Sequence, residues 1–456
     1  MKKILTAILV LAAIFAPIPT YARGSMNLDS TAVILMEQTT GRILYSRNER
    51  VPHYPAHATK MLTALVALEF LSPETELTIG DEIRPMPTGF PANTHAEGDT
   101  VTVYTLLHSL LIRSASESAR VLALNVARQI EGRRNLPQPE AERIFAIAMN
   151  EKARSLGTTG SHFNNPLGVH SENHFTTALD LAIITRAFME EPLLAQIAAT
   201  RVFEYNERTW TSVNQMLPDA PHGHPYIIGA MTGNTAAAGH VFAAAAHDTT
   251  TGLQVVSIVL GSTEAARWQD TRRLIDHAFI NFAFREIVRE NDLLATVDIE
   301  NPRQGDLTTL DIHAAQSITA LLSREEYAAI TKTINFDPLL YAENESPNLR
   351  LRAPIAESAT VGTVVFATDS TTGGNALTFE VSVIAAREVI NRSFDSDMDY
   401  FLANFFGNIF SMRGLPWWLA IFGTFFGIVG TICVFRTRRR IRRDDSRVYG
   451  AKSRYR

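Results

Sequence analysis

The sequence predicts an α/β protein of the α+β kind, with an antiparallel sheet flanked by helices and a smaller β-rich domain after it. A hairpin pattern occurs near the start of the chain, and a second one lies between residues 239 and 261. Long amphipathic helical patterns lie between the hairpins and directly after the second. Hairpins supply antiparallel strands and amphipathic helices need an apolar surface to cover, so together they favour a sheet with helices packed on it.

Each hairpin consists of two apolar runs separated by turn residues. Ala32–Met36 and Arg42–Tyr45 are separated by the turn Thr39-Thr40-Gly41. Gly239–Ala246 and Gly252–Gly261 are separated by a polar segment that is rich in threonine. Such runs, bounded by Gly, Thr and Asp, are typical of β-strands joined by a tight connection.

The helical segments follow from apolar residues that recur on one face. Pro55 leads into an apolar run after Lys60, which predicts a loop that enters a buried helix. Thr176 or Thr177 suits a helix N-cap, with Asp180 in the first turn. Thr102–Ile130 is expected to be mostly helical, and the other expected helices are Ala141–Leu156, Thr176–Met189 and Glu264–Arg289.

The composition changes near Asn291. Short β-like runs separated by Gly, Pro and Thr follow, and they predict a separate β-rich domain over residues 291–390. We expect a helix over Glu325–Ile334 to interrupt it. Residues 391–416 include an aromatic and nearly uncharged stretch, Met398–Ile409, which is expected at a membrane surface.

Both ends of the chain carry membrane-targeting patterns. Residues 1–22 combine two lysines, a short apolar core and small residues for cleavage, which predicts a secretory signal peptide; an uncleaved anchor is the alternative. Residues 417–435 contain no charge and are long enough to cross a bilayer. The basic tail 436–456 follows, so the tail is expected in the cytoplasm and the main domains outside.

The composition limits the kinds of partner that the protein is expected to bind and the interactions that can stabilise its fold. The chain has 456 residues and a net charge of −5, and its body has no basic stripe, which argues against a nucleic-acid partner. The only cysteine, Cys433, lies in the predicted membrane span. The exported part therefore has no disulfide and must be stable through its own core.

Several stretches, in this order, resemble one known family. The first hairpin leads to Pro55-Ala56-His57-Ala58-Thr59-Lys60, Phe163-Asn164-Asn165-Pro166-Leu167-Gly168 follows, and Gly229-Ala230-Met231-Thr232-Gly233 comes last. Over residues 26–288 the chain resembles the D-alanyl-D-alanine carboxypeptidases, which are low-molecular-mass penicillin-binding proteins. The resemblance implies a transpeptidase-like fold, a serine acyl-enzyme mechanism without a cofactor or metal, and peptidoglycan stem peptides as substrate. Its three motifs are S-x-x-K, S-x-N and K-T-G.

The first motif falls on residues 57–60 and lacks its nucleophile. Lys60, which the family implies as the base, is retained, but His57 stands at the position of the serine. No lysine of this chain has a serine three positions before it, so a shift of register cannot supply the pair. An acyl-enzyme needs an attacking oxygen or sulfur beside a base, and this pair has none.

The second and third motifs are also altered. Ser114 is the retained serine of the second motif, while Ser116 replaces the asparagine that would bond the substrate amide. In the third motif, Met231 replaces the lysine that the resemblance implies for the substrate carboxylate. Thr232 and Gly233 are retained, as a hydroxyl donor and as a position that admits a ligand close to the strand.

These changes predict a catalytically inactive member that acts in binding or scaffolding at the membrane. One alternative is weak serine-type activity through Ser114 with Lys60 and His57. A second is a histidine-based metal protein, because a metal site needs about three or four convergent ligands and the chain has 13 histidines. The natural ligand and the oligomeric state are not predicted. The histidines considered for a metal are His57, His174, His222, His224 and His240.

Overall fold

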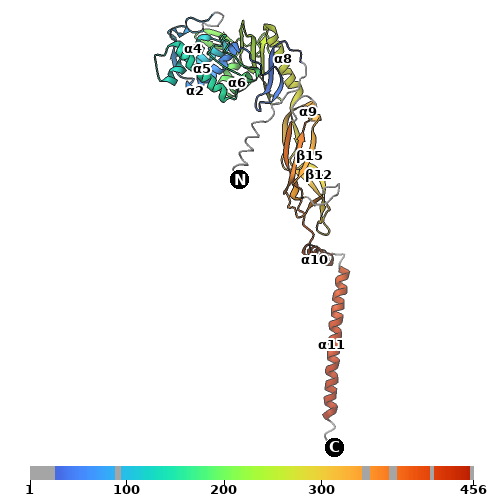
Figure 1. The fold of residues 1–456 in the computed structure, drawn as a ribbon. Helices are drawn as coiled ribbons and strands as arrows, with labels where there is room; N and C mark the ends of the chain where they lie inside the picture. Colours follow the sequence, from blue (N-terminus) through green and yellow to red (C-terminus); the bar gives the residue numbers. More distant parts are fainter. Residues whose placement is uncertain (1–25, 88–93, 341–349, 369–376, 411–414, 452–456) are drawn as a thin grey trace, which may run out of the picture. The chain divides into compact units, whose positions relative to one another are not determined.

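The computed structural model describes residues 26–87, 94–340, 350–368, 377–410 and 415–451 (Figure 1). These divide into two compact units. The first contains the chain up to Ile287 with Thr319–Thr331 and Ala367–Thr378, and the second contains Val288–Ile318, Lys332–Phe366 and the chain from Phe379 onwards. The predicted signal peptide, residues 1–22, lies outside the described residues. The domain boundaries at 26–288, 291–390 and 391–416 remain predictions.

The first unit is built on a six-stranded antiparallel sheet. The strands run in the order β2-β1-β10-β9-β7, and β8 also pairs with β9. Both predicted hairpins are confirmed, since β1 pairs with β2 and β9 with β10. The strands are β1 (Ala32–Glu37), β2 (Ile43–Arg47), β7 (Ile227–Gly229), β8 (Thr232–Thr235), β9 (Gly239–Asp248) and β10 (Leu253–Ser262).

Helices cover both faces of this sheet. In β1, Val33 and Leu35 pack with α8, while Ile34 and Met36 face the larger helical layer, because alternate residues of a strand point to opposite faces. The larger layer and α8 are both labelled in Figure 1. The helices are α2 (Thr59–Phe70), α3 (Val103–Ile112), α4 (Ser116–Glu131), α5 (Gln138–Ser155), α6 (Ala178–Glu190), α7 (Pro192–Ala199) and α8 (Glu264–Asn281). This is the predicted α+β fold.

Short elements complete the first unit. The hairpin of β5 and β6 and the helix α7 were not predicted from the sequence. The remaining elements are η2 (Ala56–Ala58), η3 (Asp81–Ile83), β3 (Glu76–Thr78), β4 (Thr100–Thr102), β5 (Val202–Tyr205), β6 (Arg208–Thr211), β11 (Phe282–Val288), β14 (Ile318–Ser323) and α9 (Arg324–Ala328).

Two predicted helices are shorter than expected. The helix expected to reach Arg289 ends at Asn281, and Phe282–Val288 forms the strand β11, because its aromatic and β-branched residues suit an extended chain. The helix expected over Glu325–Ile334 ends at Ala328. The strand β15 (Thr331–Phe336) follows, since Thr331, Thr333 and Ile334 are β-branched.

The second unit contains the predicted β-rich region. Its sheet has the strand order β15-β17-β18-β13-β12-β16, in which β12 and β16 are parallel. Buried Leu310, Ile312, Val364 and Val383 contribute to its interior. The other elements are β12 (Leu293–Glu300), β13 (Thr309–Ala314), η4 (Pro338–Leu340), β16 (Arg350–Arg352), β17 (Thr360–Ala367), β18 (Thr378–Ala385) and α10 (Phe394–Phe410).

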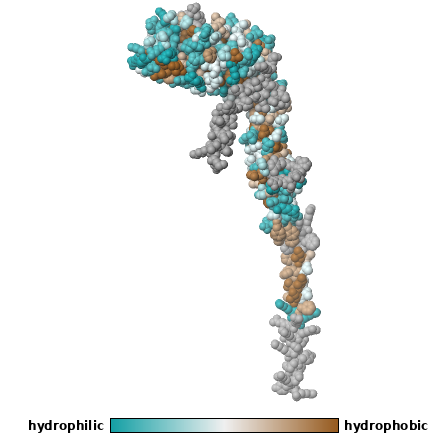
Figure 2. Space-filling view, viewed as in Figure 1, coloured by the Kyte–Doolittle hydropathy of each residue, from teal (hydrophilic) through white to brown (hydrophobic). Residues whose placement is uncertain are grey.

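The last described element is the long helix α11 (Leu415–Ala451). Within it, Leu419–Arg438 has the length and composition of a membrane-spanning helix, close to the predicted span 417–435. Figure 2 shows apolar residues along this part of the helix, and none of it is buried within the protein.

Candidate active site

The first motif lies where the 3-10 turn η2 enters α2. His57 is the middle residue of η2, and Lys60 lies in the first turn of α2. The apolar residues that follow Lys60 draw α2 into the core, so Lys60 is fully buried and His57 is 5% exposed. The first motif therefore lies inside the unit, where each polar group needs a partner.

The lysine of the first motif contacts both serines of the second. Lys60 Nζ lies 3.0 Å from Ser114 Oγ and 3.1 Å from Ser116 Oγ, and it donates to the carbonyl oxygen of Ser114. Ser114 occupies the corner between α3 and α4 with φ of 56°, which is uncommon for a residue other than glycine. In this conformation, both the carbonyl oxygen and the hydroxyl of Ser114 lie close to Lys60 Nζ.

Burial sets the charge state of the first motif. It lowers the pKa of Lys60 to about 7, although the nearby carboxylate of Glu117 acts in the opposite direction. Burial, and then the charge of Lys60, lowers the pKa of His57 to about 3. The imidazole is therefore neutral at pH 7, while Lys60 is partly deprotonated and can accept a proton. Glu117 is buried beside them and accepts hydrogen bonds from the amide and hydroxyl of Thr94, each 2.7 Å long.

The third motif packs directly on the first. A Cβ atom at Gly233 would lie 2.7 Å from the backbone nitrogen of His57, so only glycine allows β8 this close to η2. Gly168, with φ of 83°, packs on η2 in the same way, because a Cβ there would meet the carbonyl oxygen of Ala56. The structure therefore brings residues 57, 60, 114, 116 and 231–233 into one region of the first unit.

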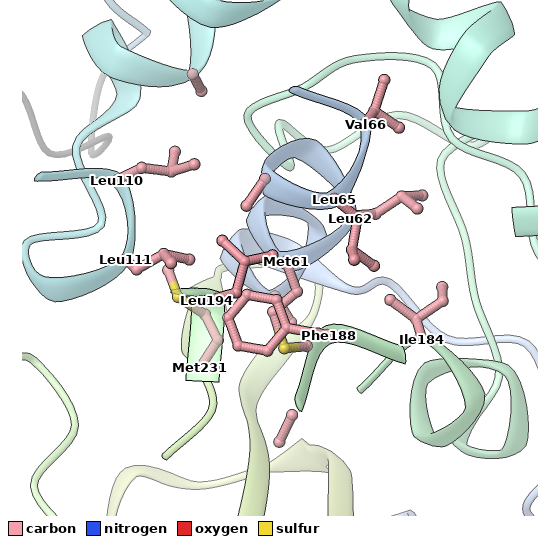
Figure 3. Packing of buried hydrophobic residues seen from close by; sticks show 14 of the residues in the cluster. Met61, Leu62, Leu65, Val66, Leu110, Leu111, Ile184, Phe188, Leu194 and Met231 are labelled. Atoms are coloured by element: carbon pink, nitrogen blue, oxygen red, sulfur yellow. The ribbon is translucent and has the colours of Figure 1, made fainter. Parts of the chain in front are cut away.

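Within that region, Met231 points into the core. Its side chain is 1% exposed and belongs to the main hydrophobic cluster. Figure 3 shows it among Met61, Leu111 and Leu194. The thioether therefore fills apolar volume and supplies no charge to the region.

The third motif is contacted by a positively charged side chain, that of Arg267 in α8. Arg267 of α8 donates from Nη1 to Thr232 Oγ1 over 2.8 Å and is 8% exposed. Burial lowers its pKa, which Glu264 partly offsets. Its Nε is buried without a hydrogen-bond partner, and no carboxylate of the described residues forms an ion pair with it. Sequence reasoning missed Arg267, because only the packing of α8 on the sheet brings it to Thr232.

The histidines considered for a metal site do not assemble. His174 bonds Thr59 and His224 bonds Asp276, in separate places. Across the described ranges, no group of three His, Cys, Asp or Glu side chains is placed to hold a metal ion. The geometry therefore gives the metal alternative no support.

The comparisons with known proteins agree with the fold and with the family resemblance. The sequence family described as D-alanyl-D-alanine carboxypeptidase, peptidase S11, matches residues 19–264. D-alanyl-D-alanine carboxypeptidase DacF of Bacillus subtilis is 23% identical over 388 residues, which cover 81% of this chain and 91% of DacF. DacB2 of Mycobacterium tuberculosis is 31% identical over 225 residues, 47% of this chain and 69% of DacB2.

Solved structures show the same fold. Penicillin binding protein 5 of Haemophilus influenzae matches with a TM-score of 0.55 and 21% identity, covering 80% of this chain and 99% of that one. The D-alanyl-D-alanine carboxypeptidase DacD of Francisella tularensis matches with a TM-score of 0.57 and 22% identity, covering 81% and 95%. Because the family matches more than half of its length, the chain belongs to the D-alanyl-D-alanine carboxypeptidase family, peptidase S11.

Proposed function

We propose that this protein binds the carboxylate end of peptidoglycan stem peptides outside the cytoplasmic membrane without cleaving them. The observation that carries the proposal is the buried, neutral imidazole of His57 at the nucleophile position. An imidazole with a pKa of about 3 has little basicity, and nucleophilic strength falls with basicity. Loss of a serine nucleophile costs about a millionfold in turnover in a serine protease.

The retained polar groups do not replace that nucleophile. Lys60 can still accept a proton, but the hydroxyls of Ser114 and Ser116 are buried and occupied with Lys60 itself. The region therefore keeps its base and lacks an exposed attacking oxygen.

Binding is supported by the state of Arg267. Burial of this guanidinium is costly, because one hydroxyl is its hydrogen-bond partner and the nearby carboxylate of Glu264 offsets the effect of burial only in part, so an incoming anion would compensate it. A peptide's terminal carboxylate matches its planar N–H groups, with Thr232 beside it. Arg267 thus takes the role that the family resemblance implied for the lysine at position 231.

The test uses the full chain in detergent with labelled penicillin and with two peptides, one ending in D-Ala-D-Ala acid and one in the amide. We expect no covalent label, no release of D-alanine, and tighter binding of the acid. Arg267→Gln should abolish the preference for the acid, whereas Arg143→Gln, at an exposed arginine on α5, should not. D-alanine release by the wild type would contradict the proposal.

One observation favours a second candidate, weak serine-type activity through Ser114. Its Oγ lies 3.0 Å from Lys60 Nζ, and the pKa of Lys60 is about 7, which is the arrangement of a serine activated by a base. Burial of Ser114 argues against it. A penicillin adduct that maps to Ser114 and disappears in Ser114→Ala would establish this activity.

We further propose that α11 anchors the protein with a single span. Its apolar part ends where the arginines begin, and cytoplasmic loops carry the positive charge. Protease treatment of intact cells should remove both units and leave the basic tail protected. An ectodomain that resists the protease until the cells are lysed would contradict this topology.

A further inference from the structure

Trp268 is a buried residue whose ring is held by three neighbours. It follows Arg267 in α8 and is 3% exposed. The edge-to-face contact with Phe242 of β9 has a centroid distance of 4.9 Å, and His222 stacks on the indole at 5.6 Å. The Arg267 guanidinium carbon lies 4.2 Å from the centroid of the same ring. The indole is therefore a fixed surface against which the guanidinium lies.

The two groups that hold the Arg267 guanidinium, Thr232 and Trp268, both neighbour Phe242 of the strand β9. Thr232, which accepts its hydrogen bond, is the register partner of Phe242 in the pairing of β8 with β9. Phe242 in turn contacts Trp268. The guanidinium is thus held at one nitrogen by a hydroxyl, and its carbon lies over the indole, while Nε has no hydrogen-bond partner among the described residues.

The His222 ring that stacks on Trp268 belongs to a loop that is hydrogen-bonded to α8. Arg272 Nη2 donates to the carbonyl oxygens of His222 and Gly223, over 3.0 and 2.8 Å. His224 Nε2 lies 3.1 Å from Asp276 Oδ1. These bonds hold the His222 ring where it stacks on the indole.

We propose that Trp268 is a positioning residue that orients Arg267 for a ligand's carboxylate, with His222 as its support. This inference rests on the proposed function. The indole fixes the plane of the guanidinium, so that the N–H groups not used by Thr232 stay directed at the anion. An oriented planar donor distinguishes a carboxylate from an amide, whereas a guanidinium free to turn loses that selectivity.

The experiment measures the ratio of the dissociation constants of the full chain for the D-Ala-D-Ala amide and acid peptides. In Trp268→Leu the preference for the acid should fall about tenfold, equivalent to about 1.4 kcal/mol, with affinity for the amide unchanged. Trp268→Phe keeps an aromatic face and should retain most of the preference. Trp210→Leu, at another buried tryptophan of the unit, is the matched control and should leave the ratio unchanged.

A double mutant separates positioning from general loss of structure. In an Arg267→Gln background, Trp268→Leu should change the ratio no further, because the group it orients is gone. If Trp268→Leu does not fold, His222→Ala should lower the preference two- to threefold by loosening the indole. A wild type without acid preference overturns the proposed function together with this inference. A wild type with the preference, retained in folded Trp268→Leu or undiminished in His222→Ala, overturns this inference alone.

Discussion

The candidate site has two walls, and they have changed in different ways. The helical wall, formed by η2, α2 and the start of α4, contains the contacts of Lys60 with Ser114 and Ser116 and has His57 at the position where the family resemblance implies the nucleophile. The strand wall, formed by β8 with α8 behind it, has Met231 in place of a lysine but receives a cation from Arg267. In the proposed function, the helical wall lacks the reacting oxygen and the strand wall lacks the charge that the family resemblance implies at position 231.

This difference between the two walls indicates that a fold can compensate for the absence of a charge more readily than for the absence of a nucleophile. A charge acts over several ångströms and can be supplied from any element that reaches the same point. A nucleophile must lie at one position and angle relative to the ligand and the base, so a neighbouring hydroxyl does not replace it. The proposed function therefore combines binding at the strand wall with the absence of acyl transfer at the helical wall.

The largest effect is expected from restoring the missing oxygen. His57→Ser recreates the Ser-Lys pair, and with a pKa of about 7 Lys60 is partly neutral and able to take the serine proton. We expect penicillin labelling to rise from none to slow and measurable, detected by mass spectrometry of the intact protein. Peptide hydrolysis should stay low, because Ser116 still lacks the amide group.

Two control variants test whether the penicillin labelling of His57→Ser depends on the new serine and on Lys60. His57→Ala removes the same imidazole without adding a hydroxyl and should remain unlabelled. His57→Ser combined with Lys60→Met should also remain unlabelled, since the base is missing. Labelling of the His57→Ala variant would show that another residue reacts, and that the helical wall has not lost its chemistry.

The next effect tests whether the strand wall tolerates the return of its lysine. Met231 lies in the apolar cluster, so Met231→Lys places an ammonium among Met61, Leu111 and Leu194. We expect a loss of about 3 kcal/mol or more in the free energy of unfolding. Met231→Leu, similar in volume, should lose less than about 1.5 kcal/mol. Urea unfolding compares the two, and equal losses would show that position 231 still accommodates a charge.

Most of the sheet and the first motif could be predicted, because their signals are local. The hairpins follow from apolar runs separated by turn residues, and His57 and Lys60 are three residues apart on adjoining helical turns. The prediction of a helix through Arg289 was wrong from Phe282 onwards, because aromatic residues suit a buried helix face and a strand equally well.

The strand wall could be predicted only in part. Arg267 and Thr232 are 35 residues apart and meet because α8 packs on the sheet, which no spacing in the sequence encodes. The burial of Met231 likewise depends on α2, α3 and α7 meeting at one point. The order of the motifs predicted which residues form the strand wall. The source of its charge, Arg267, depends on tertiary packing and could not be predicted in this way.

A smaller effect concerns the pH dependence of stability at the helical wall. In the unfolded chain a lysine keeps its proton up to about pH 10.5, while folded Lys60 releases it near pH 7. Folding is therefore penalised fully below pH 7, and the penalty is relieved as the pH rises from 7 towards 10.5. Relative to Lys60→Met, the wild type should gain about 1.4 kcal/mol per pH unit in this window.

Urea unfolding of both proteins at pH 6, 7, 8 and 9 measures that difference. The two stability curves should be parallel between pH 6 and 7 and should diverge above it. Curves that stay parallel through pH 9 would show that Lys60 keeps its proton in the folded protein, and that the helical wall holds no base at neutral pH.

The smallest effect distinguishes the two hydroxyls near the start of α4. Ser116→Ala removes an acceptor of Lys60, while Ser118→Ala removes a buried hydroxyl that bonds Ser109 over 2.7 Å. Each should lose about 1 kcal/mol at pH 9, the usual value for a neutral hydrogen bond. At pH 6 the loss in Ser116→Ala should rise to about 2 kcal/mol, because the hydroxyl then accepts from an ammonium. The pKa of Lys60 should fall further in Ser116→Ala, so stability should begin to rise at a lower pH than in the wild type. An equal change in the profile of Ser118→Ala would mean that the profile reports the helix as a whole, and the conclusion that Lys60 is a titrating base of the helical wall would lose its support.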